Sequence, residues 1–242
     1  MRRDGQTLLE SQGITKRFGG VQAINGLDLS LEEGELRCLI GPNGSGKSTF
    51  FSLLMGIHAP DSGRIVHRGQ DITRMRPYLR VRRGLSLKFQ TTRIYKNLTV
   101  DQNLNIPHHQ ARGDENGAVS WATQELGLEG RRDFFARELT HAEQQWLEIV
   151  MALATDPDLL LLDEPTAGMT PEETHRTAEF IKSLNERGLA ILVVEHDMAF
   201  VREIERQVTV LHQGRIFATG TVEEIEAHHD VQRIYLGEED HG

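Results

Sequence analysis

The sequence contains a single cysteine, Cys38, among its 242 residues. One cysteine excludes a disulfide framework within the chain, and its place in the apolar run Leu36 to Ile40 favours a buried, unreactive thiol over a nucleophile. No run approaches the roughly 20 consecutive apolar residues that cross a bilayer; Leu159 to Leu162 has only the length of a strand. The N-terminal segment MRRDGQTLLESQG lacks an apolar stretch behind its arginines, so we expect no secretory signal and a cytosolic location.

Positive charge is also in deficit, because 27 lysines and arginines stand against 36 acidic residues, for a net charge of -9. Nucleic-acid backbones are bound mainly by Lys and Arg, so this balance disfavours nucleic acid as the main partner. The basic cluster from Arg74 to Arg83 is interpreted as a solvated helix face. Hydrophobic residues at 38% and charged residues at 26% are ordinary for a globular chain, which here is long enough for one substantial core.

Short β-type runs alternate with helical patterns along the chain. These runs show little polar alternation, as expected of strands buried on both faces, and they predict a parallel sheet covered by helices. Between Gln90 and Asp156 the pattern is mostly helical, which predicts a helical subdomain inserted into the sheet, and the polar segment from Pro107 to Gly117 is interpreted as a surface loop. The runs are Leu36–Ile40, Leu85–Phe89, Leu159–Leu162 and Ala190–Val194.

Four threonines mark where helices are expected to begin. Each precedes an acid or an amide by three residues, which is the spacing of a capping box. Pro171 follows one of them at the favoured first helical position. The four are Thr99, Thr140, Thr170 and Thr221.

The segment GPNGSGKST follows an apolar strand and opens a helical pattern, and it satisfies G-x-x-x-x-G-K-[ST]. Glycines let backbone N–H groups turn inward and approach phosphates closely. Lys47 would reach the β- and γ-phosphates and Ser48 would hold Mg2+, while the helix N-terminus faces the anion. The loop predicts phosphate binding without saying which nucleotide-dependent protein this is. Its residues are Gly41, Pro42, Asn43, Gly44, Ser45, Gly46, Lys47, Ser48 and Thr49.

The run LLLLDE ends in two carboxylates, Asp163 and Glu164, where an open α/β sheet presents residues to a ligand. Asp163 would orient Mg2+ through water, and Glu164 would polarise the water that attacks the γ-phosphate. Taken alone, the two acids are better explained as the end of a strand. The loop around Lys47 favours the functional interpretation.

The next predicted strand, from Ala190 to Val194, is followed by Glu195, His196 and Asp197. His196 would contact the γ-phosphate and position water, although a lone histidine is more often a surface or capping residue. Asp197 is itself a good N-cap for the helix that follows. The catalytic set predicted from these patterns is therefore Lys47, Glu164 and His196.

With these elements in order, the chain resembles the nucleotide-binding subunits of ABC transporters from near the N-terminus to the C-terminus. The segment LTHAEQQWLEI is similar to the signature sequence of that family, which in a head-to-tail dimer contacts the γ-phosphate held by the opposite subunit. From the residues alone, a plain capped helix explains the segment equally well. The residues assigned to the trans contact are Leu139, Thr140, His141, Ala142 and Glu143.

Two weaker matches carry further expectations. Phe18 in KRFGG matches the aromatic position that stacks on adenine in the family, and Gln90 in KFQ matches the glutamine that senses Mg2+ and moves the helical subdomain. The resemblance thus implies metal contacts from Ser48, Gln90 and Asp163. Without the rest of the pattern, Phe18 is explained as a core residue and Gln90 as a polar strand end.

The chain departs from the family pattern at three positions. Ala142 replaces the second signature glycine and adds a Cβ beside the trans phosphate contact. Glu143 stands where glutamine is commonest, and Thr170 stands where the aspartate of the loop between subunits usually lies. The departures at Ala142 and Thr170 motivate an alternative in which the chain binds ATP as a regulatory subunit without hydrolysing it.

The resemblance implies an α/β fold, with a P-loop NTPase (RecA-like) core, an N-terminal antiparallel β subdomain and an inserted helical subdomain. In this interpretation residues 1–242 form a single ABC ATPase domain, with its core at 1–90 and 157–242 and its helical subdomain at 91–156. The implied cofactors are ATP and Mg2+. The implied partners are a second ATP-binding subunit, identical or paralogous, transmembrane permease subunits and a periplasmic solute-binding protein. The implied location of this chain is peripheral, at the cytoplasmic face of the inner membrane.

The segments WLEI, EPTAGMTPEE, VVEHDMAFV and YLGEE are similar to the ATPases of urea and branched-chain amino acid importers. The implied function is ATP hydrolysis that powers import of urea, a branched-chain amino acid or a similar small polar solute. An ATPase of lipopolysaccharide export and a soluble ABC ATPase acting on DNA or ribosomes remain alternatives. The histidine pairs His108 with His109 and His228 with His229 lack the spacing of a metal site.

Overall fold

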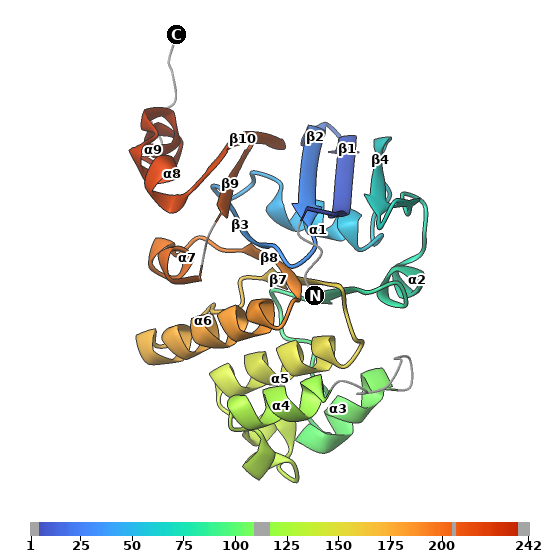
Figure 1. Ribbon diagram of the computed structural model, residues 1–242, viewed down its shortest axis with the longest axis vertical. Coiled ribbons are helices and arrows are strands. Elements are labelled where there is room, and N and C mark those ends of the chain that lie inside the picture. The colour runs from blue at the N-terminus through green and yellow to red at the C-terminus, as the bar shows by residue number, and fades with distance from the viewer. Residues whose placement is uncertain (1–4, 109–116, 205–206, 237–242) are drawn as a thin grey trace.

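The computed structural model of the protein describes residues 5–108, 117–204 and 207–236, and these residues form two sheets with helices around them (Figure 1). The first sheet is antiparallel, with strand order β2-β1-β4-β5. The second has the order β10-β9-β3-β8-β7-β6 and is parallel from β9 to β6, with β10 antiparallel at its edge. The strands are β1 (Thr7–Phe18), β2 (Val21–Glu32), β3 (Leu36–Ile40), β4 (Ser62–His67), β5 (Gln70–Asp71), β6 (Leu85–Lys88), β7 (Leu159–Asp163), β8 (Ala190–Val194), β9 (Gln207–His212) and β10 (Arg215–Gly220).

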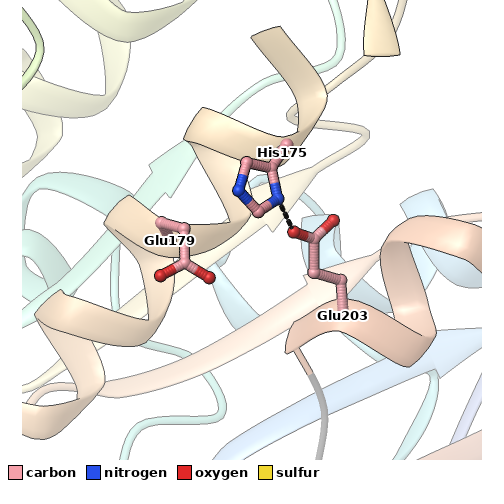
Figure 2. Close-up of side chains that lie close together, drawn as sticks. All are labelled: His175, Glu179 and Glu203. Atoms are coloured by element: carbon pink, nitrogen blue, oxygen red, sulfur yellow. Dashed lines mark hydrogen bonds and ion pairs between the residues drawn. The ribbon is translucent and has the colours of Figure 1, made fainter. Parts of the chain in front are cut away.

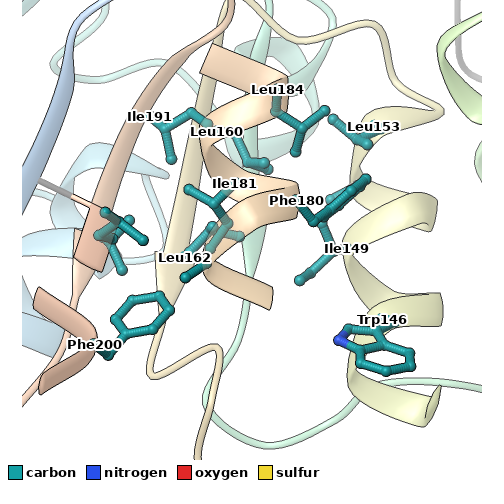
Figure 3. Close-up of a cluster of buried hydrophobic side chains, with 14 of the residues drawn as sticks. Trp146, Ile149, Leu153, Leu160, Leu162, Phe180, Ile181, Leu184, Ile191 and Phe200 are labelled. Atoms are coloured by element: carbon teal, nitrogen blue, oxygen red, sulfur yellow. The ribbon is translucent and has the colours of Figure 1, made fainter. Parts of the chain in front are cut away.

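The four runs expected to be strands are confirmed as β3, β6, β7 and β8, and they are neighbours in the parallel sheet. Every residue of β7 and β8 is buried, because both faces of the sheet are covered. Successive side chains point to opposite faces, so Leu160 and Leu162 pack in one core with the helices in Figure 3, while Leu159 and Leu161 pack in the other. Cys38 is buried in the first core, as expected.

The helices begin where the threonine pattern predicts. The hydroxyl oxygens of Thr140, Thr170 and Thr221 each accept a hydrogen bond from the backbone N–H three residues on, and Thr99 forms the same reciprocal pair with Gln102. The helices are α1 (Lys47–Leu54), α2 (Pro77–Val81), α3 (Val100–His108), α4 (Ala118–Glu125), α5 (His141–Leu153), α6 (Pro171–Glu186), α7 (Met198–Ile204), α8 (Val222–Ala227) and α9 (His229–Leu236), with 3-10 turns η1 (Glu129–Arg131) and η2 (Ala136–Glu138).

Helices α3, α4 and α5 lie together away from the antiparallel sheet (Figure 1), and α3 and α4 both pack against α5. The chain enters them after β6 and leaves them before β7, and these strands are paired neighbours, so the helices form an insertion between adjacent strands. Of the expected surface loop, Pro107 and His108 belong to α3, Gly117 caps α4, and residues 109–116 lie outside the described residues. Among the described residues, no helix has the length and apolar character needed to cross a bilayer.

The basic cluster is only partly the solvated face that the sequence predicts. Arg74, Arg76, Arg82 and Arg83 are exposed, but Arg80 is fully buried, so the prediction is wrong for that residue. The Arg80 guanidinium donates to the backbone oxygens of Leu53 and Leu54, both at 2.7 Å, and to those of Met75 and Thr73. The last carbonyls of a helix lack partners within the helix, and a cation satisfies them well, so Arg80 caps the C-terminus of α1.

Candidate functional site

The loop between β3 and α1 needs glycine where the chain passes close to its neighbours. Gly41 has a φ of 153°, and a Cβ there would lie 2.1 Å from the backbone oxygen of Leu211. Gly46 has a φ of 110°, and a Cβ there would lie 2.6 Å from the backbone oxygen of Ala23. The loop is therefore wedged between β9 and β2, in a conformation that a side chain at either position would prevent.

Lys47, the first residue of α1, turns its side chain back into this loop. Its ammonium donates to the backbone oxygens of Gly41 at 2.7 Å and Pro42 at 3.0 Å. Burial lowers the pKa of Lys47, and the charges of Glu164 and Asp163 oppose that shift. The structure thus brings the lysine of the phosphate loop and both carboxylates of the β7 end to one side of the sheet.

Asp163 ends β7 and is 7% exposed. Burial is the main cause that raises the pKa of Asp163 to about 6, and the charge of Glu164 adds to it, while the charge of Lys88, a hydrogen bond with Ser48 and the charge of Lys47 oppose it. Among the described residues, its Oδ1 has no hydrogen-bond partner. An unpaired buried carboxylate oxygen beside a serine hydroxyl is a set of oxygen donors that suits Mg2+.

Glu164 follows with a backbone φ of 45°, which is uncommon for a residue with a side chain. Its side chain is held between two other predicted site residues. Gln90 Nε2 donates to Glu164 Oε2 at 2.9 Å, and His196 Nδ1 lies 3.7 Å from Glu164 Oε1. Residues distant in the sequence therefore converge on one carboxylate at the carboxyl edge of the parallel sheet.

Sequence reasoning did not assign a role to Glu195, although it lies directly before His196. Glu195 is 1% exposed, and its Oε1 accepts hydrogen bonds from the hydroxyl of Thr166 at 2.7 Å and from its N–H at 3.3 Å. Its Oε2 accepts from the backbone N–H of His196. Glu195 therefore fixes the turn after Glu164 against the turn that carries His196. Glu195 directly follows a fully apolar strand, and this position could have predicted its role from the sequence.

The segment resembling the family signature forms the start of α5. Thr140 and Glu143 make a reciprocal capping box, and His141 Nε2 lies 3.0 Å from the backbone oxygen of Ala167. Thr140 and His141 are exposed, whereas Leu139 and Ala142 are buried. The methyl group of Ala142 therefore packs in the core. The contact of segment 139–143 with a phosphate of a second subunit stays a prediction.

Phe18 lies at the tip of the β1–β2 hairpin and is 42% exposed, so it is not the core residue of the plainer interpretation. Its ring meets the His58 ring edge-on, with centroids 5.2 Å apart, and the Lys16 ammonium lies 5.5 Å from the ring centre. The strand β2 of the same hairpin passes the phosphate loop where Ala23 approaches Gly46. An exposed aromatic surface is thereby placed at the tip of the hairpin that borders the loop.

A separate group of His175, Glu179 and Glu203 joins α6 to α7 (Figure 2), with possible ligand atoms within 4.8 Å of one another. His175 Nδ1 pairs with Glu203 Oε1, and Glu179 pairs with Lys182. We interpret the group as two solvent-accessible pairs, one between α6 and α7 and one within α6, because one oxygen of each glutamate already has a partner. Of the histidine pairs, His228 packs edge-on against Phe217, His229 lies near Asp230, and His109 is outside the described residues.

A parallel sheet whose strand-to-helix loop is shaped by glycines and holds Lys47 opposite Asp163 and Glu164 defines a P-loop nucleotide-binding ATPase. The sequence model of the family described as ABC transporter matches residues 24–167. The chain therefore belongs to the ABC transporter family, among its ATP-hydrolysing ATP-binding subunits.

The chain is similar over nearly its whole length to two curated relatives. The high-affinity branched-chain amino acid transport ATP-binding protein BraF of Pseudomonas aeruginosa is 35% identical, covering 96% of this chain and 98% of BraF. The corresponding protein LivG of Escherichia coli is 36% identical, covering 96% of this chain and 99% of LivG. The crystal structure of an ABC transporter cassette in its ADP conformation superposes with a TM-score of 0.87 at 29% identity, covering 96% of this chain and 100% of that chain.

Proposed function

We propose that this chain hydrolyses ATP at a site completed by a second ATP-binding subunit, and that the hydrolysis drives import of a branched-chain amino acid or a similar small polar solute. The observation that carries the proposal is the convergence of Gln90, His196 and the charge of Lys47 on Glu164. These three groups come from three separate segments of the chain, and Glu164 lies in a fourth. Their common target is a carboxylate poised to act on a water molecule.

In the proposed mechanism, backbone N–H groups of the loop 41–46 and the Lys47 ammonium bind the phosphates of ATP. Binding replaces the bonds that Lys47 makes to the backbone oxygens of Gly41 and Pro42. The exposed ring of Phe18 stacks on the adenine. Glu164 accepts a proton from the attacking water, and His196 orients the terminal phosphate.

Ser48, Asp163 and Gln90 would hold Mg2+, because their oxygens lie at the same edge of the sheet and Asp163 Oδ1 is unpaired there. When bound, the ion supplies charge neutralisation for the phosphate oxygens. Gln90 would then exchange its bond to Glu164 for a contact at the metal. That exchange would link the nucleotide to the helices that follow Gln90.

The second subunit would contribute the segment 139–143, whose exposed residues Thr140 and His141 stand at the N-terminus of α5. A helix N-terminus offers free N–H groups and a positive dipole end, which suit the γ-phosphate of the partner. Loss of that phosphate after hydrolysis removes the contact, so the dimer opens.

A groove of about 380 Å³ supports a permease partner. It is walled by Tyr78 and Val81 of α2 on one side and by Met151 and Ala152 of α5 on the other, and Tyr95 borders it. Tyr78 is 49% exposed and Tyr95 is 56% exposed, and exposed aromatic side chains beside an apolar groove fit a docked helix. Arg93 and Tyr95, which line or border the groove, come soon after Gln90 in the chain. A movement of α5 relative to the sheet would move one wall of the groove and so displace a helix docked in it.

The proposed cargo rests on the relatives, whose names specify branched-chain amino acid transport for BraF and LivG. With such a cargo, the chain would lie peripherally at the cytoplasmic face of the inner membrane, bound to permease subunits. A periplasmic solute-binding protein would deliver the solute to those permease subunits. Urea remains a second cargo within the same proposal. A lipopolysaccharide-export or soluble role would instead show itself by which macromolecules co-purify with the chain.

The test is Glu164→Gln, which keeps the shape of the side chain and removes its ability to take a proton. We expect ATP binding to persist and steady-state hydrolysis to fall by about 10²–10⁴-fold, the usual contribution of a general base. Glu179→Gln, on the outer face of α6, is the matched control and should hydrolyse ATP at the wild-type rate. Undiminished hydrolysis by purified Glu164→Gln would rule out the assignment.

A further inference from the structure

Lys88, the last residue of β6, is fully buried. Its ammonium donates to the backbone oxygens of Asp163 at 3.4 Å and of Glu164 at 3.3 Å. A buried ammonium is costly unless opposite charges and hydrogen bonds surround it. Here burial lowers the pKa of Lys88, and the carboxylates of Glu148, Asp163, Glu195 and Glu164 all oppose that shift, so this cation lies among four acids.

Lys88 bonds to a segment of backbone that has an uncommon conformation. Glu164 has a φ of 45°, a conformation that costs of order 1–3 kcal/mol and persists only where its surroundings impose it. Two residues after Lys88, Gln90 donates to the side chain of the same glutamate. The short segment 88–90 thus holds Glu164 at both ends, through its backbone oxygen and through its carboxylate.

One of the four acids, Glu148, connects the segment 88–90 to the helical insertion. Glu148 is on α5, the helix that begins at the segment 139–143, and it is 6% exposed. Its Oε1 accepts from the backbone N–H of Arg93 at 3.2 Å, just after Gln90. Its Oε2 has no hydrogen-bond partner among the described residues. Burial raises the pKa of Glu148, and the charge of Lys88 is the largest of the causes that oppose this shift. A shift of α5 therefore moves a charge to which Lys88 responds.

We propose that Lys88 is a positioning residue for ATP hydrolysis, whose buried ammonium holds the backbone oxygens of Asp163 and Glu164 and links them electrostatically to Glu148 of α5. The orientation of the Glu164 carboxylate then follows the position of the helical insertion. This inference rests on the proposed role of Glu164. The inference predicts that loss of Lys88 lowers the rate of ATP hydrolysis more than the affinity for ATP. The reason is that the Lys88 ammonium bonds to the backbone oxygens of Asp163 and Glu164 and not to the phosphate loop.

The first test is Lys88→Met, which keeps most of the length of the unbranched side chain and removes its charge and its donors. We expect kcat for ATP hydrolysis by the purified full-length chain to fall at least about 10-fold, with KM for ATP and the Kd for ADP changed by less than about 3-fold, the pattern of an interaction that acts on turnover. Lys182→Met, at a half-buried lysine of α6 that lies outside the site, is the matched control and should leave all three unchanged.

The second test is Glu148→Gln, alone and combined with Lys88→Met. Alone it should lower kcat with little change in KM. The double variant should hydrolyse ATP no more slowly than Lys88→Met, because both changes break one link. A kcat equal to wild type in either single variant, or an equal loss of binding and turnover, would overturn the proposal. If Lys88→Met does not fold, the kcat of Glu148→Gln decides it.

The outcomes also separate this inference from the proposed function. If Glu164→Gln abolishes hydrolysis while Lys88→Met turns over normally, only the positioning role fails. If Glu164→Gln hydrolyses ATP normally, the assignment of Glu164 fails first.

Discussion

Replacement of Arg80 by methionine should destabilise the protein, because that side chain satisfies the C-terminus of α1 from inside the core. Its two shortest hydrogen bonds, at 2.7 Å, go to the backbone oxygens of Leu53 and Leu54. Hydrogen bonds to a charged group contribute about 1.5–3 kcal/mol each, so the two together contribute about 3–6 kcal/mol. Methionine also removes the desolvation cost of a buried guanidinium, so we expect a net loss of about 3 kcal/mol in the free energy of unfolding.

For a chain of this length that loss corresponds to a decrease in Tm of about 6–12 °C. The assay is urea denaturation followed by circular dichroism, with no nucleotide present. Arg82→Met is the matched control, since Arg82 belongs to the same basic cluster but is exposed, and it should stay within about 0.5 kcal/mol of wild type. Equal effects of the two substitutions would refute the assignment of Arg80 as the cap of α1.

Two further predictions concern pH and the permease. Burial, with the charges of Arg68 and Arg83, lowers the pKa of His67 from 6.5 to about 4, so the unfolded chain binds this proton first and stability should fall by up to about 3 kcal/mol as pH drops from 6.5 to 4. His67→Leu should flatten that part of the curve of unfolding free energy against pH, and an unchanged slope would contradict the cause. Tyr95→Ala should abolish co-purification with the permease while leaving ATP hydrolysis by the isolated chain intact; undiminished co-purification would exclude this groove as the docking site.

The parallel sheet could be predicted from the sequence because its strands are buried on both faces and are therefore continuous apolar runs such as Leu159–Leu162. The capping boxes and the phosphate loop could be predicted as well, since both depend on residues a fixed few positions apart. Their geometry is local, so it survives whatever the rest of the chain does. The order of strands, by contrast, was not predicted, because it depends on pairing between segments that are distant in the sequence.

What could not be predicted depends on contacts between distant segments. Arg80 lies in a run of exposed arginines, and nothing in its neighbours shows that α1 ends against it. Lys88 closes an apolar strand, where a lysine is usually expected to reach water, yet the end of β7 covers it. The positive φ of Glu164 could not be predicted either, because the residue type at the end of a strand does not specify its backbone conformation.

Ala142 and Thr170 depart from the family pattern, and the contacts of these two residues in the fold bear on whether the departures disable the site. Ala142 is 1% exposed and packs within the core of the helices, so its methyl group adds buried apolar contact. Thr170 caps α6 through the N–H of Glu173. Neither residue takes part in the two contacts that join Gln90 and His196 to Glu164, where hydrolysis is proposed to occur. The alternative of a subunit that binds ATP without hydrolysing it stays a prediction, and ATP turnover by the assembled transporter tests it.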